Sequence, residues 1–199
     1  MHGPPLQAGR GRSALRAFIA IEPPAQVRQA LGDLIVRLRK APGKASWVRP
    51  DNMHLTLRFL GDVSEKQVAV IVEQLGELCA RTPAFNLSVA GLGAFPNLRR
   101  PSVIWAGVVP LDPVLRPLQQ AAEEAARAAG LEPETKPFHP HITLARLKDS
   151  RNAQELSALV ESFKAFDAGA FLVSHVLLLS SELTPKGPIY TCIEEFSLS

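Results

Sequence analysis

The tetrapeptide HLTL at residues 54–57 returns as HITL at residues 141–144, 87 positions further along the chain. Each copy lies in an apolar stretch that is typical of a β-strand, and each stretch stands between segments with helical periodicity. A motif that recurs in two similar settings indicates an internal duplication. The repeat therefore predicts two related lobes, each with one copy of the motif.

The side chains of each copy fall on two opposite faces of its strand, because side chains alternate along a β-strand. His54 and Thr56 share one face, as do His141 and Thr143, while the aliphatic residues share the other. One HxTx motif alone would be a weak indication, but two copies in a chain with five histidines predict a functional cleft. His139 could support His141, although a structural role at the entrance of the strand is the favoured interpretation.

Strands and helices alternate along the rest of the chain. Segments with apolar residues at helical spacing occupy residues 25–40, 64–80, 112–130 and 152–163. Stretches typical of strands occupy residues 15–22, 85–95, 102–109, 141–147, 170–183 and 189–198, with a turn and a further strand within 47–61. This order favours an α+β fold with largely antiparallel sheets and helices packed on one side.

Two helix starts have clear sequence signals. Ser64 followed by Gln67 predicts a capping box. Asp112 followed by Pro113 predicts a cap with proline at the first helical position, and Gly130 marks the end of that helix.

The 199 residues are 46% hydrophobic and 21% charged, which is the composition of a globular protein with a core. Residues 1–13 are rich in Gly, Pro and Arg and predict a flexible tail before a single bilobal domain at 14–199. No apolar run reaches the ~20 residues of a membrane span, and neither Cys79 nor Cys192 belongs to a CxxC pair. We expect a cytoplasmic monomer with free thiols, and the net charge of +3 suits a nucleotide or phosphate ligand without requiring one.

Paired histidines suit acid–base chemistry at phosphorus. An imidazole titrates near pH 6.5, so one ring can be neutral while its twin is protonated. The neutral ring can take a proton from an attacking water, and the protonated ring can give one to a leaving oxygen. The two threonine hydroxyls suit the non-bridging phosphate oxygens. Neither motif has a carboxylate or cysteine at ligand spacing, so the chemistry requires no metal or other cofactor.

The sequence resembles the 2H phosphoesterase superfamily, named for two HxTx motifs, and within it the RNA 2′,3′-cyclic phosphodiesterases, also called 2′-5′ RNA ligase-like proteins. The resemblance runs in order from about residue 16 to the end of the chain. The stretches that carry it are RAFIAIEPP (16–24), WVRPDNMHLTLRFLGDV (47–63), GLGAFPNLRRPSVIWAGV (91–108), FHPHITLARL (138–147) and SSELTPKGPIY (180–190).

The resemblance implies a bilobal α+β fold with pseudo-twofold symmetry, in which two antiparallel sheets with helices outside enclose a central cleft. It also implies opening of a 2′,3′-cyclic phosphate to a 2′-phosphate, with cleavage of the bond to O3′. His54 would be the general acid that protonates O3′, and His141 the general base that activates water. Thr56 and Thr143 would bind the phosphate.

Two further residues acquire roles from the resemblance, and a third from its position on the strand. Arg146 matches a family arginine that stacks on the terminal base or neutralises phosphate. Phe18 is the candidate for the opposing aromatic, with a simple core role as the alternative. Arg58, two places after Thr56, could reach phosphate, with a solvated position at the sheet edge as the alternative.

The implied partners are RNA ends or nucleotides with a 2′,3′-cyclic phosphate, from tRNA fragments and oligonucleotides to cyclic mononucleotides and ADP-ribose cyclic phosphate. Two other functions remain open. A 2′-5′ RNA ligase could use the same site in reverse, although no Gly-rich nucleotide loop or nucleotidyl-accepting lysine motif is visible. A non-catalytic module could bind RNA ends or nucleotides, although both His–Thr pairs are intact.

Overall fold

The computed structural model describes residues 14–42, 44–149, 153–185 and 187–199, so the predicted tail at 1–13 lies outside the described residues. The helices are α1 (Ala25–Leu38), α2 (Glu65–Cys79), α3 (Leu115–Ala128) and α4 (Gln154–Ser162), with a 3₁₀ turn η1 (Pro50–Asn52). The strands are β1 (Leu15–Ile21), β2 (Ala45–Trp47), β3 (Leu55–Val63), β4 (Phe85–Phe95), β5 (Val103–Pro110), β6 (His141–Leu147), β7 (Asp167–Val173), β8 (His175–Thr184) and β9 (Gly187–Ser197). None of the helices in these ranges is long and apolar enough to cross a membrane.

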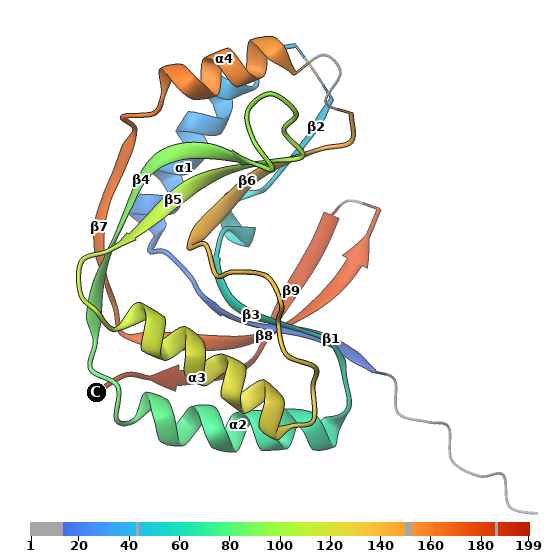
Figure 1. Ribbon diagram of the computed structural model, residues 1–199, viewed down its shortest axis with the longest axis vertical. Coiled ribbons are helices and arrows are strands. Elements are labelled where there is room, and N and C mark those ends of the chain that lie inside the picture. Colours follow the sequence, from blue (N-terminus) through green and yellow to red (C-terminus); the bar gives the residue numbers. More distant parts are fainter. Residues whose placement is uncertain (1–13, 43, 150–152, 186) are drawn as a thin grey trace, which may run out of the picture.

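The strands form one curled antiparallel sheet in the order β7-β4-β5-β6-β3-β1-β8-β9, with β2 paired to β6 (Figure 1). We call β1, β3, β8 and β9 with α2 and α3 the first lobe, and β2 and β4–β7 with α1 and α4 the second lobe. The helices cover the outside of the two lobes (Figure 1). The predicted α+β fold of two antiparallel lobes is confirmed. Neither lobe is a continuous half of the sequence, because β1 belongs to the first lobe and α1, directly after it, packs on the second.

The two copies of the motif meet where the lobes join. β3 and β6 pair through Leu55 and Ile142, which are the residues between histidine and threonine in the two copies. Both are buried, with 2% and 1% of their surface exposed. They belong to one hydrophobic cluster that runs through both lobes. Burial of this pair thus fixes the two strands against each other and directs their polar residues to the other face.

The predicted helix starts have different outcomes. The capping box of Ser64 and Gln67 is present, so that prediction is confirmed. The prediction for Asp112 and Pro113 is wrong, because α3 begins at Leu115 without a side-chain cap. The Asp112 carboxylate instead accepts a hydrogen bond of 2.8 Å from the backbone N–H of Asn86 in β4. The Asp112 carboxylate therefore accepts its hydrogen bond from a neighbouring strand and not from the first turn of α3, as the local sequence had predicted.

A register shift in β3 changes the faces of the residues after Thr56. In the pairing with β1, Thr56 lies opposite Ala20 but Arg58 lies opposite Ile19. Arg58 is consequently buried, with 8% exposed, and its Nε atom lies 2.5 Å from Oε2 of Glu123 in α3. Both interpretations of Arg58 are wrong, because this side chain neither reaches the cleft nor lies at a solvated edge.

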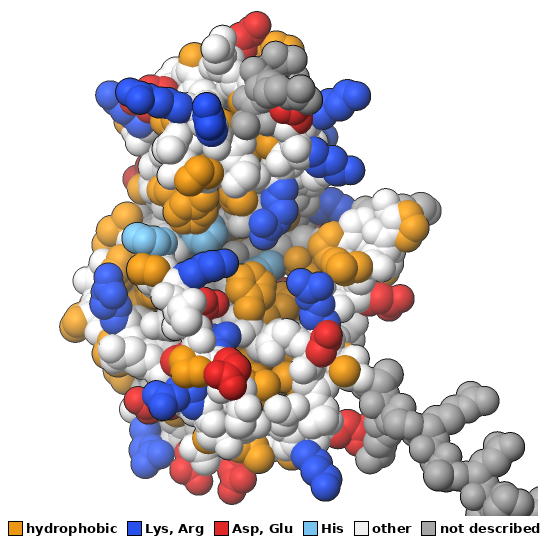
Figure 2. All heavy atoms as spheres, turned by 45° about the vertical axis from the view of Figure 1, so that its right-hand side comes forward, with side chains coloured by type: hydrophobic (Ala, Val, Ile, Leu, Met, Phe, Trp, Pro, Cys, Tyr) orange, Lys and Arg blue, Asp and Glu red, His pale blue; other side chains and the backbone are white. Residues whose placement is uncertain are grey.

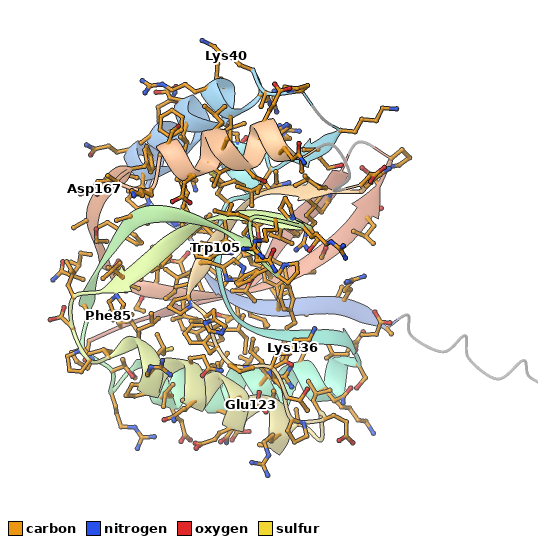
Figure 3. All side chains as sticks on the ribbon, turned by 45° about the horizontal axis from the view of Figure 1, so that its top comes forward. Lys40, Phe85, Trp105, Glu123, Lys136 and Asp167 are labelled. Atoms are coloured by element: carbon orange, nitrogen blue, oxygen red, sulfur yellow. The ribbon has the colours of Figure 1, made fainter. Side chains whose placement is uncertain are left out.

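Replacing Gly93 with alanine should weaken the second lobe by about 1–3 kcal/mol. A Cβ atom at Gly93 would lie 2.3 Å from the indole carbons of Trp105, its partner on β5 (Figure 3). Urea denaturation of the variant would measure the loss. Gly76→Ala is the matched control, since its Cβ would meet only Phe196 at 4.0 Å, and a gain of about 0.5–1 kcal/mol is expected in mid-helix. Equal stability of Gly93→Ala and the wild type would contradict this reading of the packing.

Candidate active site

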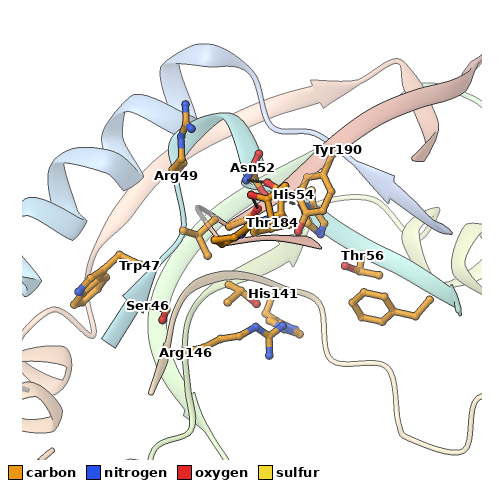
Figure 4. Close-up of a pocket in the computed structure, with 16 residues that line it drawn as sticks. Ser46, Trp47, Arg49, Asn52, His54, Thr56, His141, Arg146, Thr184 and Tyr190 are labelled. Carbon is orange, nitrogen blue, oxygen red and sulfur yellow. Dashed lines mark hydrogen bonds between the residues drawn. The ribbon is translucent and has the colours of Figure 1, made fainter. Parts of the chain in front are cut away.

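A cavity of about 450 Å³ lies between the lobes beneath the β8–β9 hairpin (Figure 4). It contains five of the seven residues proposed from the sequence, which are His54, Thr56, His141, Thr143 and Arg146. The other residues that line it are Ser46, Trp47, Val48, Arg49, Asn52, Phe59, Thr184, Pro185, Gly187, Pro188 and Tyr190. Figure 2 shows histidines in a hollow between the lobes, with Lys and Arg side chains around it.

The two histidine rings are held in the same way. Nδ1 of His54 lies 2.8 Å from the carbonyl oxygen of Asn52, and Nδ1 of His141 lies 2.7 Å from that of His139. A carbonyl can only accept a hydrogen bond, so each Nδ1 carries the proton and donates it. In the neutral ring Nε2 then holds a lone pair that is free to accept or return a proton. His139 contributes through its backbone, whereas its own side chain is exposed.

Aromatic rings enclose His54. The Phe18 ring lies 4.7 Å from the imidazole, and the Tyr190 ring meets it edge-on at 5.2 Å. Phe18 is 3% exposed and does not line the cavity, so it packs behind the histidine. Burial lowers the pKa of His54 to about 4, and the positive charges of His141 and Arg146 act in the same direction.

His141 has an equivalent aromatic support in the second lobe. The Phe95 ring meets the imidazole edge-on at 4.9 Å, and the Trp105 ring lies 6.2 Å away. Burial lowers the pKa of His141 below its ordinary value of 6.5, and Arg146 and His139 act in the same direction. Both rings are therefore largely neutral at pH 7 before a ligand enters the cavity.

Three of the lining residues that the sequence did not predict shape the site. Phe59 is 54% exposed at the cavity, because the register shift in β3 directs it to the cleft. Tyr190 lies within the quoted stretch 180–190, and burial raises the pKa of its hydroxyl, which stays protonated. Asn52 donates a hydrogen bond of 2.9 Å to the Pro188 carbonyl and so ties the turn before His54 to the hairpin (Figure 4). All three lie in the family-like stretches 47–63 and 180–190, but no pattern in the sequence marked them as site residues.

The cavity is not built like a metal centre. Across the ranges that the structure describes, no three His, Cys, Asp or Glu side chains come together as a possible ligand set. The groups that line it instead include two imidazoles, the hydroxyls of Thr56, Thr143 and Thr184, and the guanidinium groups of Arg49 and Arg146. These groups can exchange protons with a substrate and donate hydrogen bonds to an anion.

Two facing HxTx strands at one cavity define the class of 2H phosphoesterases. The chain matches the family described as "LigT like Phosphoesterase" over residues 21–105 and 109–190, and it belongs to this family. A relative named RNA 2′,3′-cyclic phosphodiesterase from Aquifex aeolicus is 38% identical over 76% of this chain and 81% of its own length. One of the same name from Methanothermobacter thermautotrophicus is 34% identical over 92% and 99%.

Solved structures show the same fold. TT0787 of Thermus thermophilus superimposes with a TM-score of 0.78 at 31% identity, over 92% of this chain and 98% of that one. E. coli LigT complexed with 3′-AMP superimposes with a TM-score of 0.76 at 27% identity, over 94% and 99%. Another structure of E. coli LigT holds phosphate.

Proposed function

We propose that this protein hydrolyses 2′,3′-cyclic phosphate ends of RNA or nucleotides and leaves a 2′-phosphate. The observation that carries the proposal is the convergence of two His–Thr pairs on one cavity, each ring held through Nδ1 so that Nε2 is available. The names of the relatives point to the same substrate.

The proposed reaction is an in-line displacement at phosphorus. Nε2 of His141 takes a proton from water as the water oxygen attacks phosphorus. The bond from phosphorus to O3′ breaks on the opposite side, and protonated His54 gives its proton to O3′. The hydroxyls of Thr56 and Thr143 donate hydrogen bonds to the non-bridging oxygens, where negative charge grows. Proton release by one histidine and uptake by the other restore the starting state after a turnover.

The nucleoside is proposed to lie beside Arg146. Its guanidinium can neutralise phosphate or stack on a base, and it lines the cavity. The aromatic partner proposed from the sequence was Phe18, which lies buried behind His54. Phe59 is exposed to the cavity, so we assign the stacking surface to Phe59 and a positioning role to Phe18.

Product identity tests the proposal. An RNA oligonucleotide with a 2′,3′-cyclic end should yield a 2′-phosphate, which a 3′-specific phosphatase leaves intact and ³¹P NMR identifies. A 3′-phosphate product would mean that the bond to O2′ breaks. No turnover with intact binding would favour the non-catalytic module, and joined products would favour the ligase. Turnover should persist in excess EDTA, because no step uses a metal.

The pKa values of the two rings predict an acidic optimum. The productive form has one ring protonated and the other neutral, and its population is greatest between the two pKa values. We expect kcat/KM for 2′,3′-cyclic AMP to peak between about pH 4 and 6.5. Above that range both rings are neutral and the rate falls about tenfold per pH unit; below it both rings are protonated. A maximum above pH 7 would contradict the lowered values.

A further inference from the structure

Exposed cations gather beside the cavity at one end of the second lobe. They are Lys44, Arg99, Arg100, Arg146 and Lys148, and we call them the basic rim. Strand register brings them together, although they come from three segments. Ser46 lies opposite Arg146, so Lys44 precedes the strand that pairs with the end of β6. Leu147 donates a backbone hydrogen bond of 2.9 Å to Ser102, at the end of the loop that carries the two arginines.

The loop with the two arginines is held in shape by its own hydrogen bonds. Oδ1 of Asn97 accepts from the backbone N–H groups of Arg99 and Arg100 at 3.0 and 3.1 Å. Ser102 closes the loop, since its N–H and its hydroxyl donate to the Phe95 carbonyl at 2.7 and 2.9 Å. The backbone that presents the guanidinium groups is thus ordered before a ligand binds.

The charges of the basic rim are available to a partner. Within the described ranges, none of its five side chains has an acidic partner at ion-pair distance. Arg146 also lines the active-site cavity and therefore connects the rim to the reacting centre. Blue side chains border the hollow in Figure 2 accordingly.

Acidic residues outnumber basic ones on the opposite side of the cavity. A second cavity of about 500 Å³ shares Arg49, Asn52, Pro188 and Tyr190 with the first, and three acidic residues line it. The acids are Glu22, Asp51 and Glu195, and Leu177, Leu179 and Ile189 also line the cavity. Arg49 lies 3.8 Å from one of the acids, Asp51, as an exposed ion pair. A chain of phosphates would be repelled on this side and attracted on the other.

We propose that the basic rim binds the RNA strand that precedes the cyclic end. The inference rests on the proposed function, and it implies that polynucleotides are better substrates than mononucleotides. A 2′,3′-cyclic phosphate occupies both ribose oxygens, so it lies at the 3′ end and the rest of the strand continues from O5′. With the cyclic phosphate between the histidines, the strand leaves across the basic rim and away from the acidic cavity. Phosphates on the rim release counterions, which makes affinity depend on salt.

The test compares two substrates in one variant. Arg99→Gln with Arg100→Gln should lower kcat/KM for an RNA decamer with a 2′,3′-cyclic end by on the order of ten- to a hundredfold at 50 mM salt. The rate with 2′,3′-cyclic AMP should be unchanged, because neither arginine lines the cavity. The slope of log(kcat/KM) against log[salt] for the decamer should become shallower by about 1.4, or 0.7 for each lost contact.

Two control variants show whether an effect depends on where the charges are removed or only on the change in net charge. Arg81→Gln with Arg127→Gln removes the same charge from the ends of α2 and α3 in the first lobe and should change neither substrate. Glu195→Gln on the acidic side should not lower the rate with the decamer. Equal loss with both substrates, or no loss with the decamer, would overturn the basic rim as an RNA surface.

A binding measurement tests the RNA surface independently of the hydrolysis reaction. Fluorescence anisotropy with a labelled RNA decamer measures affinity without turnover. If the wild type bound the decamer through the basic rim but hydrolysed neither substrate, the proposed function would fail and the RNA surface would stand. If the Arg99→Gln, Arg100→Gln variant bound the decamer as tightly as the wild type, the RNA surface would fail whatever the activity.

Discussion

Replacing either His54 or His141 with asparagine is expected to lower kcat for 2′,3′-cyclic AMP by about 10²–10⁴. The reason is that each ring transfers one proton in the proposed step and no other titratable group lines the cavity at a matching pKa in the described part of the chain. Asparagine preserves a polar side chain of similar reach but cannot exchange a proton near neutral pH. Initial rates under saturating substrate would measure the loss.

The two variants should also differ in their pH profiles. Loss of the general base removes the acidic limb of the profile, and loss of the general acid removes the other limb. The double variant should lose little more than the worse single variant, because the two groups act in one step. His139→Asn is the matched control, since its carbonyl supports His141 while its side chain is exposed, and it should keep most of the activity. A double variant with wild-type turnover would refute the two-histidine mechanism.

The core of the site could be predicted from the sequence because strand alternation is a local rule. It placed His54 with Thr56 and His141 with Thr143, and the structure brings both pairs to one cavity. The lobes were predictable for the same reason, since each copy of the motif has its own apolar face. The sequence did not predict that α1 would pack on the second lobe while β1, directly before it, belongs to the first. The amphipathic pattern of α1 shows which of its faces is buried but not which part of the sheet covers that face.

Other site residues depend on geometry that no local pattern encodes. The register shift between β1 and β3 turns Arg58 into the core and directs Phe59 to the cleft. Phe18 reaches His54 because β1 pairs with β3, and Tyr190 reaches it because β8 and β9 return beside β1 after most of the chain. Contacts of this kind join residues far apart in the sequence, and pairing rather than propensity determines them.

The buried Arg58 gives the largest expected effect on stability. Glu123→Gln should destabilise the protein by about 3–5 kcal/mol, because it leaves a guanidinium buried without a counter-charge. Arg58 is 8% exposed and Glu123 20%, so solvent screens their interaction only weakly. Arg58 also donates to the backbone carbonyls of Phe59 and Glu132, which cannot replace the lost negative charge. Urea denaturation would measure the change in the free energy of unfolding.

The exposed pair Arg81–Glu77 is the matched control for this prediction. Its charged atoms lie 3.6 Å apart, but the side chains are 76% and 66% exposed, so Glu77→Gln should cost less than about 1 kcal/mol. Replacing both partners of the buried pair, as in Arg58→Met with Glu123→Leu, should restore much of the stability, since no charge is then left unpaired. Because Phe59 follows Arg58, the same double variant also tests whether the ion pair holds Phe59 in its position at the cleft. A double variant that is stable but binds nucleotide weakly would show that the ion pair positions β3 for the site. A double variant that is no more stable than Glu123→Gln would show that the unpaired charge is not the cause of the lost stability.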